Sequence, residues 1–247
     1  MNFKLYAKVF TTGERILKEL HESLGVQEFT ESTTNDNLVA LNTMPWPRKE
    51  IISIGNSAGV ACGDGNLLNV QIFKVAGIPE VTVKETVNGV FVLENDQLRV
   101  QVVDGTITSL YDRKAAREVI PKGGKANQLV IFDDKPLYWQ AWDVEVYHLD
   151  SRKELPPGET KIFQRDAHQV GIVTETKISA KSWAKTYITL SAAVKDQQSY
   201  VEVHSEVEWR EDKKFLKVEF PVDVRNTEAS YETQFGIVRR PTHYNTT

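Results

Sequence analysis

Residues 89–111 read GVFVLENDQLRVQVVDGTITSLY, and this stretch decides the fold. Three apolar runs are separated by two polar turns, and the second turn is the pair Asp104-Gly105. Asp-Gly between alternating apolar residues is a strong hairpin signal, because both central positions of the tightest turns need a positive φ. Alternation of apolar and polar side chains also predicts strands with one buried face and one wet face. The stretch therefore predicts an antiparallel meander of three strands.

The same pattern continues in both directions along the chain. Short apolar runs bounded by Pro and Gly precede it at 38–42, 50–54, 69–75 and 80–84, and further runs follow it at 170–178, 184–191, 200–209 and 215–220. Short strands with turn residues between them are typical of an all-β sandwich. The predicted fold class is mainly β, with an N-terminal helix followed by antiparallel β-sandwich domains.

The first 24 residues have helical spacing instead. One face repeats at steps of three and four residues, at Phe3, Tyr6, Phe10, Gly13, Leu17, Leu20 and Leu24. Gly25 is a good residue to end a helix, whereas Thr11 with Glu14 resembles a capping box and leaves open two shorter helices. A single amphipathic helix cannot bury its face alone, and the rest of the sequence offers no partner helix. We expect its partners to be missing from this chain.

Composition excludes several classes of protein. The 247 residues carry 30 Lys and Arg against 34 Asp and Glu, a net charge of −4, so we expect no nucleic-acid partner. No run approaches the ~20 apolar residues of a membrane span. The single cysteine, Cys62, excludes an internal disulfide framework and a cysteine zinc site. We predict that Cys62 is a small buried hydrophobe.

Several acidic side chains and one histidine gather in the middle of the chain. The carboxylates are Asp133, Asp134, Asp143, Glu145, Asp150 and Glu154. A pair of them could act as the two carboxyl groups of a glycosidase, although solvated acids are common on any sandwich. His148 and Asp150 have the spacing of two metal ligands on a strand, but a zinc site needs three or four. We predict a surface or hydrogen-bonding role for His148 and no metal site.

An aromatic run, Leu137-Tyr138-Trp139-Gln140-Ala141-Trp142-Asp143, lies within this acidic region. A strand cannot bury three such close aromatics on one face, because successive side chains alternate. Either the run forms an aromatic corner that closes the sandwich, or its rings stack on a sugar while Asp and Gln bind hydroxyls. Near the end of the chain, Pro241 cannot donate a ladder hydrogen bond, so residues after the preceding apolar strand are expected to leave the sheet.

Four segments in collinear order resemble one enzyme family. They are Asn42-Thr43-Met44-Pro45-Trp46-Pro47-Arg48; Gly105 to Asp112 with Arg117-Glu118-Val119; Phe132 to Glu145; and Tyr231 to Gly236 with Arg240 to Thr246. Together they are similar to the α-mannosidases of glycoside hydrolase family 38, in the cytosolic and vacuolar subgroup. Gln140 departs from that pattern, in which Asp is commoner at this position.

The resemblance implies an internal piece of a larger retaining enzyme that hydrolyses terminal α-mannosyl residues of oligosaccharides. Three regions are implied: 1–29, a helix from a three-helix bundle; 30–86, a small β domain; and 87–247, a truncated mutarotase-like supersandwich. Zinc and the catalytic nucleophile are expected in a missing catalytic domain, so this chain would be inactive alone. The expected location is cytoplasmic or vacuolar, and whether the parent enzyme is a homo-oligomer stays open.

Five residues are the candidate contacts to an oligosaccharide or mannoside at the rim of that active site: Tyr138, Trp142, Asp143, Arg240 and His243. Two other functions stay open at this stage. One is a non-catalytic module that binds carbohydrate or serves as a scaffold. The other is a mutarotase-like sugar epimerase, in which a pair such as His148 and Glu145 would move a proton at the anomeric centre.

Overall fold

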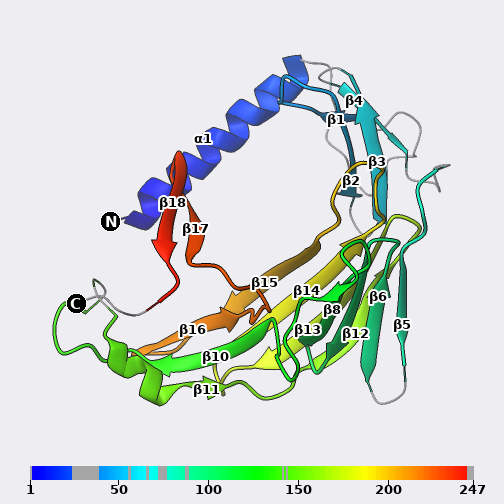
Figure 1. Ribbon diagram of the computed structural model, residues 1–247. Coiled ribbons are helices and arrows are strands. Elements are labelled where there is room, and N and C mark those ends of the chain that lie inside the picture. The colour runs from blue at the N-terminus through cyan, green and yellow to red at the C-terminus, as the bar shows by residue number, and fades with distance from the viewer. Residues whose placement is uncertain are drawn as a thin grey trace.

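The computed structural model describes residues 2–23, 39–54, 57–64, 67–71, 77–86, 89–140, 142 and 144–243. It is mainly β, with antiparallel sheets and one N-terminal α-helix, as predicted (Figure 1). The helix α1 (Asn2–Ser23) is continuous, and the alternative of two shorter helices is wrong. The Thr11 hydroxyl donates to the Ala7 carbonyl one turn earlier instead of capping a second helix. No helix in the described part of the chain is long and apolar enough to cross a membrane.

A small sheet follows the helix, with strand order β1-β4-β3-β2. Its strands are β1 (Val39–Leu41), β2 (Arg48–Ile54), β3 (Ser57–Gly63) and β4 (Leu67–Gln71). Cys62 of β3 is exposed, so the prediction of a buried cysteine is wrong. Its cross-strand partners are Lys49 and Asn69, and side chains opposite one another share a face of the sheet. The polar character of both neighbours explains why Cys62 faces solvent.

The predicted meander lies in a five-stranded sheet in which each strand pairs with the next along the chain. Its strands are β5 (Thr82–Glu85), β6 (Val90–Glu94), β7 (Leu98–Val103), β8 (Thr106–Asp112) and β9 (Arg117–Glu118). Asp104 and Gly105 have φ values of 51° and 79°, the conformation expected at the hairpin turn. Because β5 pairs with β6, this sheet extends across residue 86; the division into domains there stays a prediction.

A four-stranded sheet packs on this meander. It contains β12 (Glu159–Arg165), β13 (Gln169–Lys177), β14 (Trp183–Ser191) and β15 (Val201–Glu208). The main core lies between the two sheets and takes Phe91, Leu93, Val100 and Val102 from one and Val170, Ile172, Ile188 and Leu190 from the other. This packing of two antiparallel sheets is the predicted β-sandwich.

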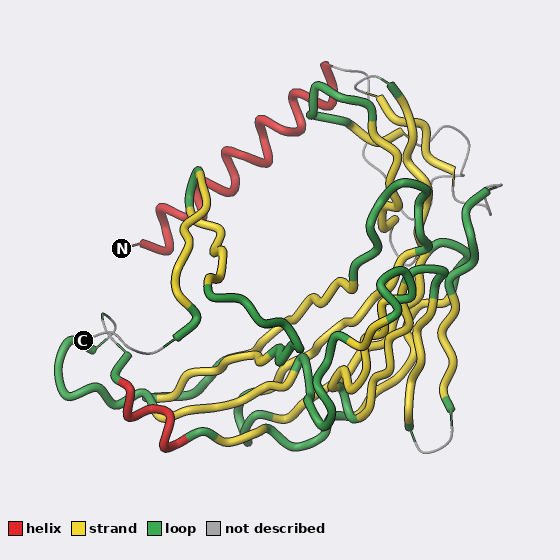
Figure 2. The backbone as a smooth tube through the Cα atoms, viewed as in Figure 1, coloured by secondary structure: helices red, strands yellow, loops and turns green. Residues whose placement is uncertain are grey.

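Two smaller sheets complete the described chain. Strand β10 (Gln128–Asp133) lies between β11 (Lys153–Glu154) and β16 (Lys214–Glu219), and the hairpin of β17 (Glu228–Thr233) and β18 (Gly236–Pro241) stands apart. In Figure 2 the hairpin rises from the sheets towards the helix. Strand β18 ends at Pro241, as the missing N–H predicts.

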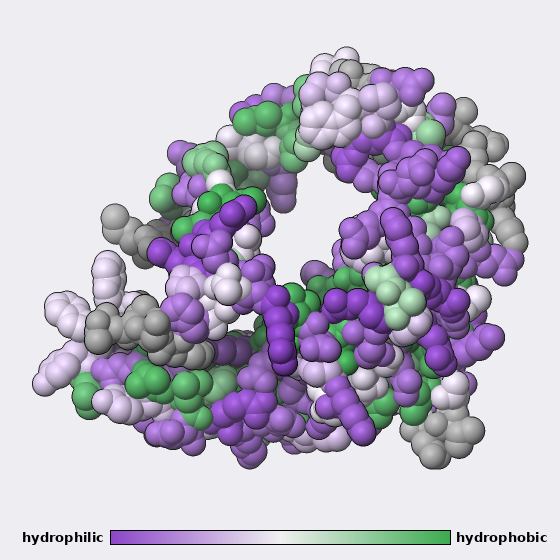
Figure 3. Space-filling view, viewed as in Figure 1, coloured by the Kyte–Doolittle hydropathy of each residue, from purple (hydrophilic) through white to green (hydrophobic). Residues whose placement is uncertain are grey.

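Helix α1 lies across an opening from the sandwich, and Figure 3 shows free space between them. The apolar side chains of its stripe are exposed, with Phe10 at 68% and Leu17 at 54%. The described residues therefore leave this face uncovered, and its partners in a helical bundle stay a prediction.

Candidate functional site

The candidate rim residues Tyr138 and Trp142 lie in a loop, residues 134–145, that joins β10 to the short 3-10 helix η1 (Val146–Ser151). Their side chains are 75% and 86% exposed. Two hydrogen bonds fold the loop on itself: the Trp142 N–H donates to the Trp139 carbonyl at 2.9 Å, and the Leu137 N–H donates to the Glu145 carboxylate at 3.0 Å. The loop thus presents its aromatic rings to solvent rather than closing the sandwich. Asp143 lies outside the described residues.

Arg240 and His243 lie on and just after β18. Arg240 pairs with Ala229 of β17, and both candidate side chains are exposed. Figure 1 draws this end of the chain and the 134–145 loop on the same side of the view. No hydrogen bond or ion pair joins Arg240 or His243 to Tyr138 or Trp142 among the described residues. Their shared role at a rim stays a prediction.

Two lysines hold the carboxylate of Asp133, one of the acidic residues of this region. Asp133 accepts hydrogen bonds from Lys214 and from Lys135, the second at 2.9 Å. The hydrogen bond from Lys214, followed by that from Lys135, lowers the pKa of Asp133 below its usual range. A general acid needs a raised pKa, so Asp133 is unsuited to that role.

His148 is half-buried and both of its ring nitrogens have partners, as the hydrogen-bonding role predicts. Its Nδ1 lies 2.7 Å from the Glu145 carbonyl and its Nε2 lies 3.0 Å from the Lys217 ammonium. Nδ1 is therefore the donor and Nε2 the acceptor, since an ammonium group can only donate. The ring also packs against Phe132 and Phe215 at centroid distances of 5.1 and 5.0 Å. With both nitrogens engaged, His148 is poorly placed to accept a proton from a sugar.

Within the described chain, no group of three or more His, Cys, Asp or Glu side chains is arranged to hold a metal ion. His148 and Asp150 have no third ligand that would make the sequence spacing into a zinc site. The family resemblance implies zinc in a catalytic domain outside this chain, and the described residues offer no group of ligands that would hold it.

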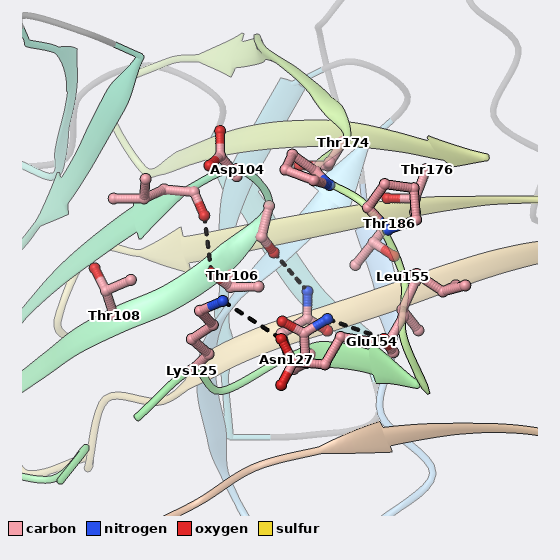
Figure 4. Close-up of a pocket in the computed structure, with 16 residues that line it drawn as sticks. Asp104, Thr106, Thr108, Lys125, Asn127, Glu154, Leu155, Thr174, Thr176 and Thr186 are labelled. Atoms are coloured by element: carbon pink, nitrogen blue, oxygen red, sulfur yellow. Dashed lines mark hydrogen bonds and ion pairs between the residues drawn. The ribbon is translucent and has the colours of Figure 1, made fainter. Parts of the chain in front are cut away.

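A separate pocket lies where three sheets meet and has a volume of about 210 Å³ (Figure 4). It is lined by the β7–β8 turn, the segment leading into β10, strand β11 with the Pro156-Pro157 loop, and strands β13 and β14. Figure 4 shows mostly polar side chains around it, among them Thr106, Thr174, Thr176, Thr186 and Asn127. We call it the threonine pocket.

The sequence identified the turn at one edge of this pocket but missed the pocket itself. Asn127 has a φ of 60°, and Asn is one of the few residues that tolerate that region. An isolated asparagine in a loop carries too little signal to predict this. Thr174 and Thr176 lie in a strand that the alternation of apolar and polar residues in the sequence predicts. The surroundings of their side chains depend on pairing between distant strands, which the sequence does not show.

Comparison with known proteins identifies the family. Residues 93–247 match the family described as the glycosyl hydrolases family 38 C-terminal domain. The chain is 37% identical to alpha-mannosidase 2C1 of Homo sapiens over 231 residues, which cover 85% of this chain and 21% of that protein. It is 36% identical to alpha-mannosidase of Saccharomyces cerevisiae over 230 residues, 89% of this chain and 20% of that protein.

Alpha-mannosidase G of Dictyostelium discoideum is 28% identical over 229 residues. The chain spans about one fifth of the length of each of these relatives. The matching segment begins in β6 and includes the sandwich from β7 onward, the 134–145 loop and the β17–β18 hairpin. The chain belongs to glycosyl hydrolase family 38, and it carries the C-terminal domain of that family.

Proposed function

We propose that this chain is the non-catalytic β region of a retaining α-mannosidase that removes terminal α-mannosyl residues from oligosaccharides. One observation carries the proposal: proteins named alpha-mannosidase match 85–92% of the chain, while the chain spans only 20–21% of them. The catalytic groups would then lie in the remainder of such a protein. The proposed location is cytoplasmic or vacuolar, after the subgroup that the sequence motifs resemble.

Zinc and the nucleophile are proposed to belong to a catalytic domain outside this chain. The share of the relatives that the chain leaves uncovered, about four fifths of their length, supports this. Helix α1 is proposed to be one helix of a three-helix bundle, which would cover its exposed apolar stripe.

An activity measurement tests the proposal. We expect the 247-residue chain to show no zinc-dependent turnover of an aryl α-mannoside, whereas a longer protein containing it and a family 38 catalytic domain should hydrolyse that substrate. Adding a chelator should abolish turnover by the longer protein, and added zinc should restore it. Turnover by the 247 residues alone would contradict the proposal.

The rim residues are tested in the longer, active protein. If the exposed aromatic loop and the end of β18 contact substrate, Trp142→Ala and Arg240→Ala should each lower kcat/KM for an oligosaccharide about tenfold, a loss of about 1.4 kcal/mol. Tyr138, Asp143 and His243 belong to the same proposal.

Two matched controls separate a substrate contact from a general effect. Trp183 is also exposed but lies on β14, and Arg239 neighbours Arg240 on the opposite face of the hairpin. Trp183→Ala and Arg239→Ala should leave kcat/KM unchanged. If both rim variants have the kinetics of the wild-type protein, Trp142 and Arg240 do not contact the substrate.

A carbohydrate-binding module is the second candidate, because the 134–145 loop presents its aromatic side chains to solvent. Binding of oligosaccharide by this chain without turnover in any longer protein would favour it. The epimerase alternative is less suited to the structure, since both ring nitrogens of His148 are already engaged.

A further inference from the structure

Trp139 has a backbone conformation that aromatic residues rarely adopt. Its φ is 58°, in the left-handed region, where the Cβ of a bulky residue lies too close to the following carbonyl oxygen. Among the described residues only one other aromatic, Phe235, has a positive φ. Phe235 lies in the two-residue turn that closes the β17–β18 hairpin between Thr233 and Gly236, and such tight turns place a residue at positive φ. Trp139 lies instead in the 134–145 loop, which joins a strand to a 3-10 helix and forms no hairpin.

The contacts that Trp139 makes within this chain do not offset its backbone strain. The side chain is 76% exposed, so its burial against the described residues contributes little. The Trp139 carbonyl accepts the Trp142 N–H at 2.9 Å, but Trp139 is the first residue of that turn, a position that needs no positive φ. A strained residue whose ring stays exposed is typical of ligand-binding sites, where the surrounding structure holds the residue ready.

Hydrogen bonds at both ends of the loop supply that surrounding structure. The Leu137 N–H donates to the Glu145 carboxylate at 3.0 Å and so joins two positions eight residues apart. The Glu145 carbonyl accepts from Nδ1 of His148 at 2.7 Å, and the Asp133 N–H donates to the Ser151 hydroxyl at 2.8 Å. The loop projects beyond β10 and η1 (Figure 2), and these contacts anchor it to both elements. A loop anchored in this way can maintain a strained residue between its ends.

The groups next to Trp139 indicate what its ring binds. Tyr138 and Gln140 flank it in the sequence and are also exposed, so a phenol hydroxyl and an amide accompany the indole ring. A purely apolar partner would bury these polar groups without hydrogen bonds, which is unfavourable. A sugar offers C–H groups to an aromatic face and hydroxyls to the polar neighbours. The charge of Asp133 at the base of the loop is already paired with two lysines, which suits a neutral ligand.

We propose that Trp139 is a further substrate contact at the rim, and that its ring stacks on the sugar next to the mannosyl residue that is removed. The inference rests on the proposed function, in which the catalytic groups lie outside this chain and hold the terminal mannosyl residue. The remaining sugars of the oligosaccharide then project from those groups towards the rim. Trp139 in this position favours oligosaccharides over simple mannosides.

The test compares two substrates in the longer, active protein. One is α-mannosyl fluoride, whose leaving group is a single atom, and the other is an oligosaccharide with a terminal α-mannosyl residue. Trp139→Ala removes the ring but keeps the Cβ, and should lower kcat/KM for the oligosaccharide roughly tenfold. The loss should be confined to the oligosaccharide, because the fluoride has no second sugar. Trp139→Phe keeps an aromatic ring and should recover most of the loss.

The melting temperature separates a substrate contact from packing inside the longer protein. Trp139→Asn removes the ring and also relieves the backbone strain, because Asn tolerates a positive φ. A ring that stays exposed until substrate binds predicts that Trp139→Asn raises the melting temperature by about 2–4 °C while lowering kcat/KM for the oligosaccharide as Trp139→Ala does. Ala116→Asn is the matched control. Ala116 has a φ of 51° in the turn between β8 and β9, so its replacement should raise the melting temperature and leave both substrates unaffected.

Three results would overturn the proposal. Unchanged oligosaccharide kinetics in Trp139→Ala would show that the ring does not contact substrate, and an equal loss for both substrates would show that it does not recognise the second sugar. A lower melting temperature in Trp139→Asn would show that the ring packs inside the longer protein. Failure of the proposed function is distinguishable, because the unmodified longer protein would then not hydrolyse α-mannosyl fluoride.

Discussion

Position 105 has two requirements that only glycine meets, a positive φ and space for a close neighbour. It has a φ of 79°, and a Cβ added there would lie 2.6 Å from the Thr174 methyl group on β13. Gly105→Ala should therefore lower the free energy of unfolding by about 2–5 kcal/mol, from the backbone conformation and the steric overlap together. Urea denaturation of the intact protein measures this loss.

Gly123 is the matched control for this substitution. Its φ is 80°, but an added Cβ would meet nothing within 4 Å. Gly123→Ala should cost only about 1–2 kcal/mol, the backbone part alone. Equal losses in the two variants would show that close packing on Thr174 contributes nothing.

The hydrogen bonds to Glu118 predict that the free energy of unfolding depends on pH. Burial alone would raise the pKa of its carboxyl group, but hydrogen bonds from Ser109 and from the backbone N–H groups of Leu110, Ile120 and Val119 hold it below the ordinary value of 4.5. The folded pKa lies below the unfolded one, so this stabilisation is complete above about pH 5 and is lost as the pH falls through 4.5 and below.

Glu118→Gln should remove that part of the acid destabilisation and lower stability at pH 7 by about 1 kcal/mol, because an uncharged acceptor binds the same donors more weakly. Thermal unfolding between pH 3.5 and 7 measures both effects. Glu85→Gln changes an exposed carboxylate of the same sheet and serves as the control. An unchanged pH profile in Glu118→Gln would contradict this account.

The sequence predicts the conformation of a residue where local backbone chemistry determines it. It does not predict the exposure of a residue where pairing between strands determines its neighbours. The Asp104-Gly105 turn follows from backbone sterics, and the structure has the expected positive φ values. Cys62 was assigned to the interior from its residue type, but its neighbours across the sheet place it in solvent. The burial of Asn127, whose side-chain oxygen accepts no hydrogen bond from the described residues, results from the packing of segments that lie far apart in the sequence.

At the scale of elements, strands with clear alternation were predicted to within about two residues, as β6, β7, β13 and β14 show. The sequence missed β10 because four of its six residues are buried, so polar residues do not alternate with apolar ones along this strand. It also missed β3, whose Ala and Gly residues carry little β propensity. Tertiary pairing, rather than local preference, determines both strands.

Helix α1 yields a prediction because its apolar side chains are exposed along one face. We expect the 247-residue chain by itself to self-associate, since an exposed apolar surface of this kind binds other copies. Phe10→Ser combined with Leu17→Ser should reduce the association, measured by size-exclusion chromatography with light scattering.

Lys8→Ser combined with Glu22→Ser alters the opposite face of α1 and should leave the association as it is in the unmodified chain. A monodisperse unmodified chain would contradict the prediction, and so would equal association of both double variants. In a longer protein that covers the helix, the Phe10 and Leu17 substitutions should instead lower the melting temperature.

At the scale of the whole molecule, the sequence predicted the class and the sandwich but not which sheets meet. The core joins β6 and β7 to β13 and β14, which lie about 70 residues further along the chain. Hydrophobic periodicity tells which face of each strand is buried but not what covers it. The role of the rim residues also stays a prediction, because periodicity does not tell which other groups they contact.

The exposed position of Cys62 has a practical consequence for such experiments. It is the single cysteine of the sequence and lies on β3 of the small sheet. One maleimide dye or nitroxide spin label can therefore be attached at a known place without removing any native residue. Paired with a second label on α1, it would report the distance between the helix and the β region in solution, in this chain alone and in a longer protein that contains it.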